Sequence, residues 1–552
     1  MSGESPPRTG TDRRTFLKTV GITIGVASYG STVSVAGDGT GGRENGWNGP
    51  RSGPGRAGAT GDSGPAPFPT LDWKMDLDGG MYHVEPVVAD DVVYLAATTN
   101  NTPGERSGYL GAYDIETGDR RWKRTDVFSP KTPATDGERL YFSTHTSEEA
   151  DGDGLYALDA ESGATTWKRT DHDVWSPPVV AGDRLFTSNR DGTYAFDREN
   201  GEIVWKTNGV SGLAKDVGDA LSYADETVFV SDGNALDATD GSVKWRTPQD
   251  DATLGTPATN GEMVYYTQTD YIAADDTTVK IEARSSDTGE VEWTYESKGD
   301  NRWDGRPAIT DSHVFLVDLD AESTLRALDA DSGETAWETE LQGRFLSSPV
   351  VGDETVYLGS RYAPKLNPAA GSGLVHAVDS ATGDLRWSCL LDNDGLETSP
   401  EDAPAAGEPV VTDGKLYAVT YPANATLDYK YTYYSNFFVL GPCDRRPDGD
   451  ERLPSDGPDG GDDFPPLDVC IDVVSNLDLD SLDVGDIVRL AASCSTGREL
   501  EFAWDIDGDG QYEESGSVVS ATIPTCGSLT VELKVTDANG ATDTATVRLS
   551  TN

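Results

Sequence analysis

Between residues 71 and 443, short apolar runs alternate with turns rich in glycine and aspartate. Runs of this kind, rich in valine, tyrosine and phenylalanine, are typical of β-strands. Long helical periodicity is absent from the region, so we expect an all-β domain. One strand type recurs eight times, at Val92-Val93-Tyr94, Arg139-Leu140-Tyr141, Arg184-Leu185-Phe186, Thr227-Val228-Phe229, Met263-Val264-Tyr265, His313-Val314-Phe315, Thr355-Val356-Tyr357 and Lys415-Leu416-Tyr417.

Seven copies of a turn motif divide the same region into units of about 45 residues, the period of a propeller blade. The first copy, GAYDIETGDRRW, has Gly118 four residues before its tryptophan. Six copies carry an aspartate four residues before the glycine, and the fifth has Ser285 there. Such a side chain can hydrogen-bond the turn backbone, and glycine accepts a positive φ. The seven tryptophans are Trp122, Trp167, Trp205, Trp245, Trp293, Trp337 and Trp387.

The two ends of the repeat region complement each other. Trp73 lies in a strand-like segment that no turn motif precedes, whereas Asn436–Leu440 has no tryptophan strand after it. If the Trp73 strand completes the last unit, the ring closes with eight blades and leaves no long free edge.

The repeats resemble the pyrroloquinoline-quinone (PQQ)-type propeller family, whose blades carry the motif A-x-D-x-x-T-G-x-x-x-W. The resemblance implies an eight-bladed β-propeller over residues 71–443, with the seven motif tryptophans packed between neighbouring blades as structural residues.

Dehydrogenases of this family stack the quinone on a ring formed by two adjacent, disulfide-linked cysteines and hold Ca²⁺ with acidic and amide side chains. Here the five cysteines are Cys389, Cys443, Cys470, Cys494 and Cys526, and no two are adjacent. We therefore expect no PQQ, no catalytic residue and a non-catalytic binding or scaffold role. The alternative is a PQQ-dependent alcohol or sugar dehydrogenase.

Basic and aromatic residues gather just before the prolines that open the innermost strands. Because propeller strands begin near a central channel, these residues could line a mouth that binds an anionic or carbohydrate ligand or a peptide. The alternative is that the bases pair with carboxylates around the rim. The candidate ligand-binding residues are Lys131, Trp175, Arg302, Trp303, Arg306 and Arg344.

The N-terminal sequence predicts export. Residues 1–36 combine Arg13-Arg14 and Phe16-Leu17-Lys18 with an apolar stretch and a small-x-small site, which is typical of a twin-arginine signal peptide. Residues 37–70 contain 11 glycines and five prolines and are expected to form a linker. No later segment is apolar enough to span a membrane.

A second linker, rich in acids, proline and glycine, is expected at residues 444–467. Residues 468–552 resemble the polycystic-kidney-disease (PKD) domain through Phe502-Ala503-Trp504-Asp505 and the Val535–Asp543 segment, which implies an immunoglobulin-like β-sandwich. Asp505, Asp507 and Asp509 match half of a calcium loop, so a Ca²⁺ site and an acid-rich turn are both open interpretations.

Disulfides are permitted outside the cell. We expect a Cys494–Cys526 bridge within the C-terminal domain. A Cys389–Cys443 bridge would tie the last two blades together and leave Cys470 free.

The large negative net charge excludes two classes of negatively charged partner. With 96 acidic and 43 basic residues the net charge is -53, which excludes nucleic acid and an anionic membrane surface as partners. Such acidity fits a protein from a halophile, because concentrated salt screens carboxylate repulsion. We expect a protein of the cell exterior or cell surface whose partner is an extracellular protein, a glycan or a small anionic ligand.

Overall fold

A computed structural model gives the fold. It describes residues 46–443 and 469–550, except for positions 82–83, 101–106, 145–152, 173, 214–220, 248–252, 274–275, 299–305, 319–322, 344–345, 363–370, 394, 397, 399–403, 423–434, 474–486, 493–494, 496–499, 507–510, 524–527 and 537–541. The described residues form strands and one three-residue 3₁₀ turn, η1 (Pro50–Ser52), which confirms the all-β expectation.

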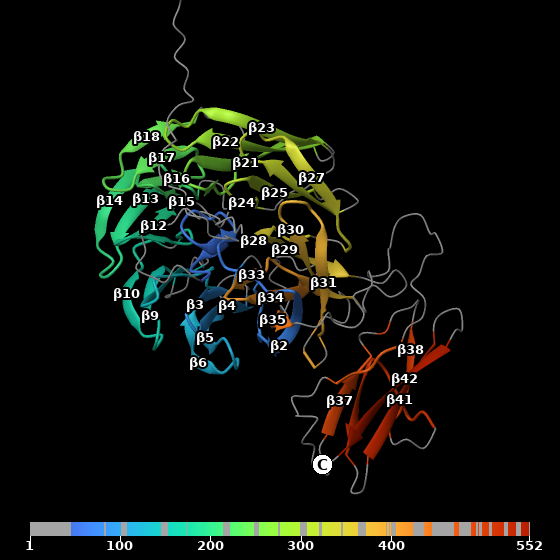
Figure 1. Ribbon diagram of the computed structural model, residues 1–552. Helices are drawn as coiled ribbons and strands as arrows, with labels where there is room; N and C mark the ends of the chain where they lie inside the picture. Colours follow the sequence, from blue (N-terminus) through green and yellow to red (C-terminus); the bar gives the residue numbers. More distant parts are fainter. Residues whose placement is uncertain are drawn as a thin grey trace, which may run out of the picture. The chain divides into compact units, whose positions relative to one another are not determined.

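Eight antiparallel sheets form from the described residues up to 443 (Figure 1). The first four contain β3 (Val87–Ala89), β4 (Val92–Asn100), β5 (Ser107–Asp114) and β6 (Arg120–Val127); β7 (Ala134–Thr135), β8 (Arg139–Ser143), β9 (Leu155–Asp159) and β10 (Thr165–Arg169); β11 (Val179–Ala181), β12 (Arg184–Asn189), β13 (Gly192–Asp197) and β14 (Ile203–Asn208); and β15 (Leu221–Ala224), β16 (Thr227–Val230), β17 (Asn234–Asp237) and β18 (Val243–Arg246).

The next four sheets repeat this order with additions. They contain β19 (Thr253–Leu254), β20 (Ala258–Thr259), β21 (Met263–Ala273), β22 (Asp276–Ser285) and β23 (Val291–Lys298); β24 (Ala308–Ile309), β25 (His313–Asp318), β26 (Thr324–Asp329) and β27 (Thr335–Glu340); β28 (Val350–Gly352), β29 (Thr355–Tyr362), β30 (Ser372–Asp379) and β31 (Leu385–Leu391), with β1 (Ala59–Thr60) added parallel to β28; and β32 (Pro404–Ala406), β33 (Val410–Thr412), β34 (Lys415–Pro422), β35 (Asn436–Cys443) and β2 (Phe68–Asp76).

In seven sheets, one short strand begins directly after a proline. A proline has no N–H to offer a strand ladder, so it suits the position at which pairing starts. These prolines are Pro86, Pro133, Pro178, Pro257, Pro307, Pro349 and Pro409.

The turn motif folds as its residue types predict. The carboxylate of Asp114 accepts hydrogen bonds from the backbone N–H groups of Glu116 and Thr117, and Gly118 has a φ of 72°. In the fifth copy, Ser285 Oγ accepts the corresponding hydrogen bond from the Thr288 N–H. A short polar side chain and a glycine therefore define each of these turns.

Each motif tryptophan lies at the seam with the next sheet. The indole Nε1 of Trp122 donates to the Ala160 carbonyl of the following sheet at 2.9 Å, and its ring lies against Gly163. The same hydrogen bond is made by Trp167, Trp205, Trp245, Trp293 and Trp337. Trp387 packs into a cluster that includes Leu416 and Tyr417 of the next sheet.

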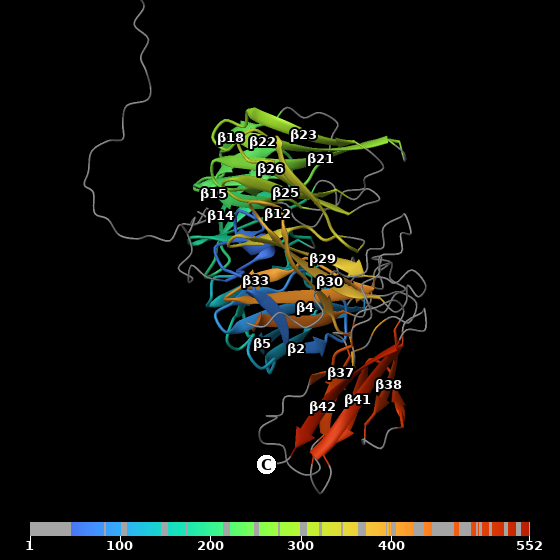
Figure 2. The ribbon, with the colours of Figure 1, turned by 45° about the vertical axis from the view of Figure 1, so that its right-hand side comes forward.

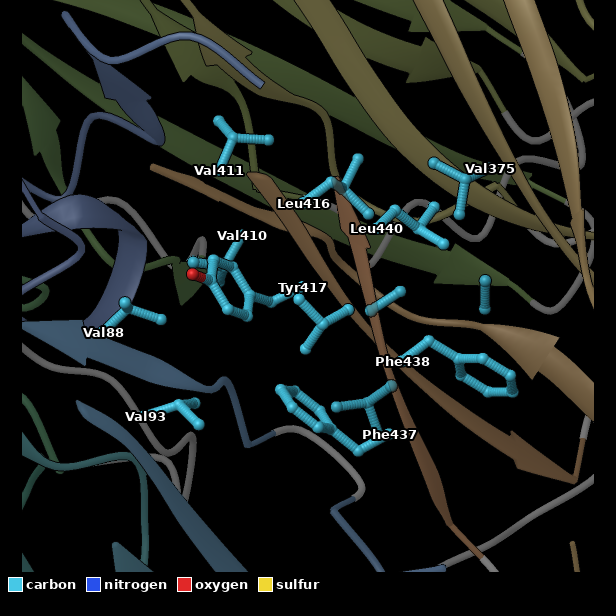
Figure 3. Close-up of a cluster of buried hydrophobic side chains, with 14 of the residues drawn as sticks. Val88, Val93, Val375, Val410, Val411, Leu416, Tyr417, Phe437, Phe438 and Leu440 are labelled. Atoms are coloured by element: carbon cyan, nitrogen blue, oxygen red, sulfur yellow. The ribbon is translucent and has the colours of Figure 1, made fainter. Parts of the chain in front are cut away.

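Strand β2 closes the cycle of seams. It pairs antiparallel with β35 as the eighth sheet's outer strand, so Phe68 lies opposite Cys443 and Asp76 opposite Asn436. Trp73 of β2 then donates to the Ile115 carbonyl of the first sheet at 2.9 Å. Figure 3 shows the core at this junction, where Val88 and Val93 of the first sheet face Val410, Tyr417 and Phe437 of the last. The described sheets thus form a closed ring, the term used below for these eight sheets.

The C-terminal strands form two further sheets. One consists of β36 (Asp472–Val473), β37 (Ile487–Ala491) and β40 (Val518–Thr522), and the other of β39 (Glu514–Ser515), β38 (Glu501–Asp505), β41 (Ser528–Thr536) and β42 (Thr542–Ser550). Strands β38, β41 and β42 lie side by side (Figure 2). Buried residues from both sheets, among them Leu490, Trp504 and Leu533, share one apolar cluster.

Within the described part of the chain, no helix is long and apolar enough to cross a membrane.

Candidate functional site at the centre of the ring

Residues 46–64 contact the innermost strands of the ring, and we call them the inner segment. They fall within residues 37–70, which the glycine and proline content predicted to be a linker. Here the structure differs: most of the inner segment is buried, and it forms η1 and β1 instead of a solvated spacer. Figure 1 shows this blue stretch surrounded by the eight sheets.

The inner segment follows the sheets in chain order through backbone hydrogen bonds. Its first contact is the antiparallel bridge between Trp47 and Val88 of β3 in the first sheet. Further along, its carbonyl groups accept hydrogen bonds from strand ends of one sheet after another. The pairs, acceptor first, are Asn48 and Thr135, Pro54 and Tyr223, Gly55 and Thr259, Ala57 and Ile309, Gly58 and Val351, Thr60 and Asp353, and Ser63 and Gly414.

The two ends of the inner segment meet at Asp62. Its carboxylate accepts hydrogen bonds from the Gly46 N–H at 2.9 Å and from Thr412 Oγ1 at 2.6 Å. The segment therefore makes one circuit of the ring before the chain crosses outward to β2.

Several glycines of the inner segment lie where a side chain would not fit. A Cβ on Gly55 would lie 2.9 Å from the Thr259 carbonyl oxygen, and one on Gly64 would lie 2.7 Å from the Tyr357 ring. The glycine content thus permits close approach of two backbones, as well as an unusual φ at Gly58.

Two buried arginines hold the segment. Arg51, which is 1% exposed, donates from Nη2 to the carbonyls of Pro307 and Pro349 at 2.7 and 2.9 Å. Arg56, which is 2% exposed, donates from Nη2 to the Pro177 carbonyl at 3.1 Å and from Nε to the Leu221 carbonyl. Between them the arginines reach four sheets of the ring.

Arg51 belongs to a cluster of four charges. Glu85 accepts from the Arg51 N–H at 2.8 Å and from Arg306 Nη2 at 2.8 Å, while Glu408 lies 3.0 Å from Arg306 and 3.5 Å from Arg51. Two cations and two anions from the inner segment and three sheets balance one another. This charge balance permits burial, because a charge without a partner would be strongly destabilising there.

Burial shifts the pKa of the acidic and of the basic side chains in this cluster. It raises the pKa of the Glu85 carboxyl, against the opposing effect of Arg306, and it lowers the pKa of the Arg51 guanidinium, against the attraction of Glu408 and Glu85. An arginine stays protonated under all such conditions, so Arg51 is a permanent buried cation.

Three of the predicted ligand-binding residues are described, and all three are engaged inside the protein. Lys131 is 7% exposed and its Nζ donates to the Trp175 carbonyl at 3.0 Å. The fully buried Trp175 ring packs edge-on against Tyr194 and Phe196. Arg306 pairs with Glu85 and Glu408, as the rim-pairing alternative supposes. Arg302, Trp303 and Arg344 lie outside the described residues.

The quinone does not fit the residues at the centre of the ring. The motif tryptophans are occupied at the seams, and backbone of the inner segment lies against the strand ends around the ring.

The predicted metal and disulfide residues are described only in part. Asp505 is 5% exposed, whereas Asp507, Asp509, Cys494 and Cys526 lie outside the described residues. Among described side chains, no group of three or more potential ligands could hold a metal ion. Cys443 is a free thiol, so the expected Cys389–Cys443 bridge is not formed, and Cys470, expected to be free, is disulfide-bonded.

Comparison with known families identifies the repeats. The family of the outer membrane protein assembly factor BamB matches residues 80–169, 106–234, 194–300 and 276–421, which together cover more than half of the chain. The chain belongs to the BamB family. The PKD domain family matches residues 474–551. The expected resemblance to PQQ-type repeats and to PKD domains is thus confirmed at the level of the family.

Individual members of the BamB family are distant. The outer membrane protein assembly factor BamB of Yersinia pestis is 27% identical over 134 residues, which are 23% of this chain and 31% of that protein. The match therefore spans about a third of the curated relative.

Solved structures are also similar. BamB from Moraxella catarrhalis is 18% identical with a TM-score of 0.45, covering 68% of this chain and 98% of its own. Quinohemoprotein alcohol dehydrogenase from Comamonas testosteroni is 15% identical with a TM-score of 0.49, covering 73% and 82%.

Sequence reasoning missed the inner segment and Glu408 as parts of the site, whereas Glu85 lies just before an innermost strand, where polar residues were expected to line the mouth. One signal was present: Arg51 and Arg56 are two arginines within a glycine-rich stretch of a chain that is poor in bases.

Proposed function

We propose that the protein is a non-catalytic binding or scaffold protein of the cell exterior. The observation that carries this proposal is the inner segment. It contacts the strand ends at the centre of the ring, where a propeller enzyme would need room for a cofactor and a substrate. The basic groups described there, Arg51 and Arg306, are already paired with Glu85 and Glu408. Recognition is then left to the outer surface of the ring and to the C-terminal domain.

The architecture that we propose is an eight-bladed β-propeller over residues 71–443, an acidic hinge over 444–467 and a PKD-like β-sandwich over 468–552. The cycle of eight seams and the pairing of β2 with β35 support the blade count. The apolar cluster shared by the two C-terminal sheets supports the sandwich. PKD-like domains are usually spacers or adhesive modules without catalysis of their own, which suits a surface-associated protein.

We also infer export by the twin-arginine route in a halophilic cell, on the strength of residues 1–36 and the net charge of -53. The partner chemistry remains that of an extracellular protein, a glycan or a small anionic ligand. The name of the BamB relatives describes a protein-assembly factor, which favours a protein partner.

Two measurements test this function. Fluorescently labelled protein added to cells of the producing organism in molar salt should be retained at their surface, and a variant that ends at Cys443 should be retained less. An equally acidic unrelated protein is the control. Absence of specific retention would contradict the surface role.

The dehydrogenase alternative is tested separately. Purified protein incubated with PQQ and Ca²⁺ and then dialysed should retain no chromophore and should reduce no dye with ethanol or glucose. A retained chromophore together with substrate-dependent dye reduction would overturn the non-catalytic proposal.

A further inference from the structure

We propose that the ring is a peptide-binding site and that the inner segment is its built-in ligand. The ligand class is an extended, glycine-rich peptide with arginines five residues apart, as at Arg51 and Arg56. On this view residues 46–64 are held by their own contacts and need no covalent link to β2 to stay in place.

Backbone hydrogen bonds join the inner segment to most of the sheets of the ring. Carbonyl groups from Asn48 to Ser63 accept from N–H groups of seven residues that lie on six different sheets. Addition of an extended peptide to strand edges is a general mode of peptide recognition, in which main-chain hydrogen bonds supply affinity whatever the side chains. A ring of converging strand ends provides many such donors around a single peptide.

The contacts of Arg51 and Arg56 make the site selective for arginine. Arg51 Nη2 is shared between the Pro307 and Pro349 carbonyls, and the same side chain faces Glu408. Arg56 bridges carbonyls that precede or open two other sheets. Fixed forks of donors of this kind match arginine and do not match the point charge of lysine.

The site also selects against side chains at two glycines of the segment, Gly55 and Gly58. A Cβ on Gly55 would lie within 2.9 Å of the Thr259 carbonyl oxygen, and Gly58 combines a φ of 63° with the Arg51 guanidinium at 2.1 Å from a Cβ position. A larger residue at the position of Gly55 would be rejected by the backbone of the ring, whereas at Gly58 the positive φ and the segment's own buried Arg51 side chain both favour glycine.

The connection to β2 is exposed. Ala66 and Pro67 are accessible, whereas Gly64 and Pro65 on one side and Pro69 on the other are buried. A site-specific protease recognition sequence inserted between Ala66 and Pro67 would therefore separate the inner segment from the ring without altering either contact surface.

The cleaved full-length chain tests the proposal. After cleavage in molar salt, the fragment that ends at Ala66 should elute with the rest of the chain on gel filtration and separate only in denaturant. Separation of the fragment under native conditions, whether or not the remainder keeps its circular-dichroism spectrum, would overturn the proposal.

Exchange with a labelled synthetic peptide of residues 45–66 measures the selectivity. The peptide should enter the cleaved protein and displace the fragment. Its Arg51→Ala form should compete roughly a hundredfold or more less well, because Arg306 is then the one cation of the cluster left to balance Glu85 and Glu408. Equal competition by the Arg51→Ala and native peptides would overturn the assigned recognition.

Two variants complete the test. Arg51→Lys keeps the charge and should release the fragment on cleavage, since lysine cannot span both carbonyls. The matched control is Arg121→Ala, which removes an arginine that pairs with Asp91 and Asp114 away from the inner segment, and it should retain the fragment. Dimers of the uncleaved protein in which the inner segment of each chain lies in the ring of the other would overturn its placement in its own ring.

Discussion

At the scale of single residues, the motif glycine has two roles: it adopts a positive φ in the turn, and it leaves room for a tryptophan ring of the preceding sheet. Gly163 has a φ of 69°, and a Cβ at this position would lie 2.8 Å from the Trp122 ring of the preceding sheet. The sequence indicated only the first role, the turn. The second role explains why glycine and tryptophan recur in the same motif: each glycine receives the indole of the sheet before it.

Gly163→Ala should therefore destabilise the ring more than Gly414→Ala. Gly414 has a similar φ of 77° but no atom within 4 Å of its Cβ position. Backbone strain alone should lower the free energy of unfolding by about 1 kcal/mol in Gly414→Ala, and overpacking against Trp122 should add about 1–3 kcal/mol in Gly163→Ala. Urea denaturation in molar salt measures the difference, and equal effects would show that the contact with the indole is not restrictive.

His376 should make stability depend on pH. The side chain is fully buried, with Nε2 donating to the Gln342 carbonyl at 2.9 Å and Nδ1 within 2.8 Å of Ser388 Oγ. Burial lowers its pKa from 6.5 to about 4. The unfolded chain then binds the proton first, so stability is full above pH 6.5 and is lost as the pH falls toward 4.

The expected loss from this residue between pH 7 and pH 5 is about 2 kcal/mol in the free energy of unfolding. His376→Gln removes the titration, so its stability should vary less over this interval than that of the wild type. Chemical denaturation at both pH values gives the two slopes. Identical slopes would mean that His376 does not carry this dependence.

At the scale of elements, the sequence predicted the ring well and its centre poorly. The Trp73 strand was correctly paired with Asn436–Leu440. The sequence allowed this because no turn motif precedes Trp73 and no tryptophan strand follows Asn436–Leu440. The inner segment was missed because flexible spacers and tightly apposed backbones use the same residue, glycine, for different reasons. Composition alone cannot distinguish a flexible spacer from a tightly packed segment. The hydrogen bonds of the buried Arg51 and Arg56 to the ring distinguish them here.

Trp73 should matter as much as a tryptophan that follows a turn motif. It donates to Ile115 and lies against Gly118 just as Trp122 does with Ala160 and Gly163. Trp73→Ala and Trp122→Ala should each lower the free energy of unfolding by about 3–5 kcal/mol. Thermal unfolding of both variants tests this, and a negligible effect at Trp73 would contradict closure through β2.

At the scale of the whole molecule, charge sets the conditions under which the fold persists. Charge balance also decides the arrangement of the candidate site, where two arginines and two glutamates are paired. Of the predicted ligand-binding residues, Lys131 donates to the Trp175 carbonyl and Arg306 pairs with the carboxylates of Glu85 and Glu408, so both bases are engaged inside the protein. Their long-range partners could not be predicted, since Arg306 and Glu85 lie on different sheets.

Stability should rise with salt. The net charge of -53 produces self-repulsion that is screened as the Debye length falls from about 10 Å at 0.1 M to about 3 Å at 1 M. The melting temperature should increase steadily from 0.1 to 2 M KCl, and sucrose of equal osmolality should reproduce only a small part of the increase. A flat response to KCl would contradict salt adaptation.

The pairing of β2 with β35 bears on how the ring can be made on a ribosome. Residues 68–76 emerge early, yet their partner strand consists of residues 436–443. Strand β2 must wait through most of synthesis with its edge unpaired, so a nascent chain halted before residue 436 has no means of closing the ring. Closure of the ring therefore has to wait until residues 436–443 have been synthesised, and products truncated before residue 436 should be recognisable to proteases by the unpaired β2 and the incomplete eighth sheet.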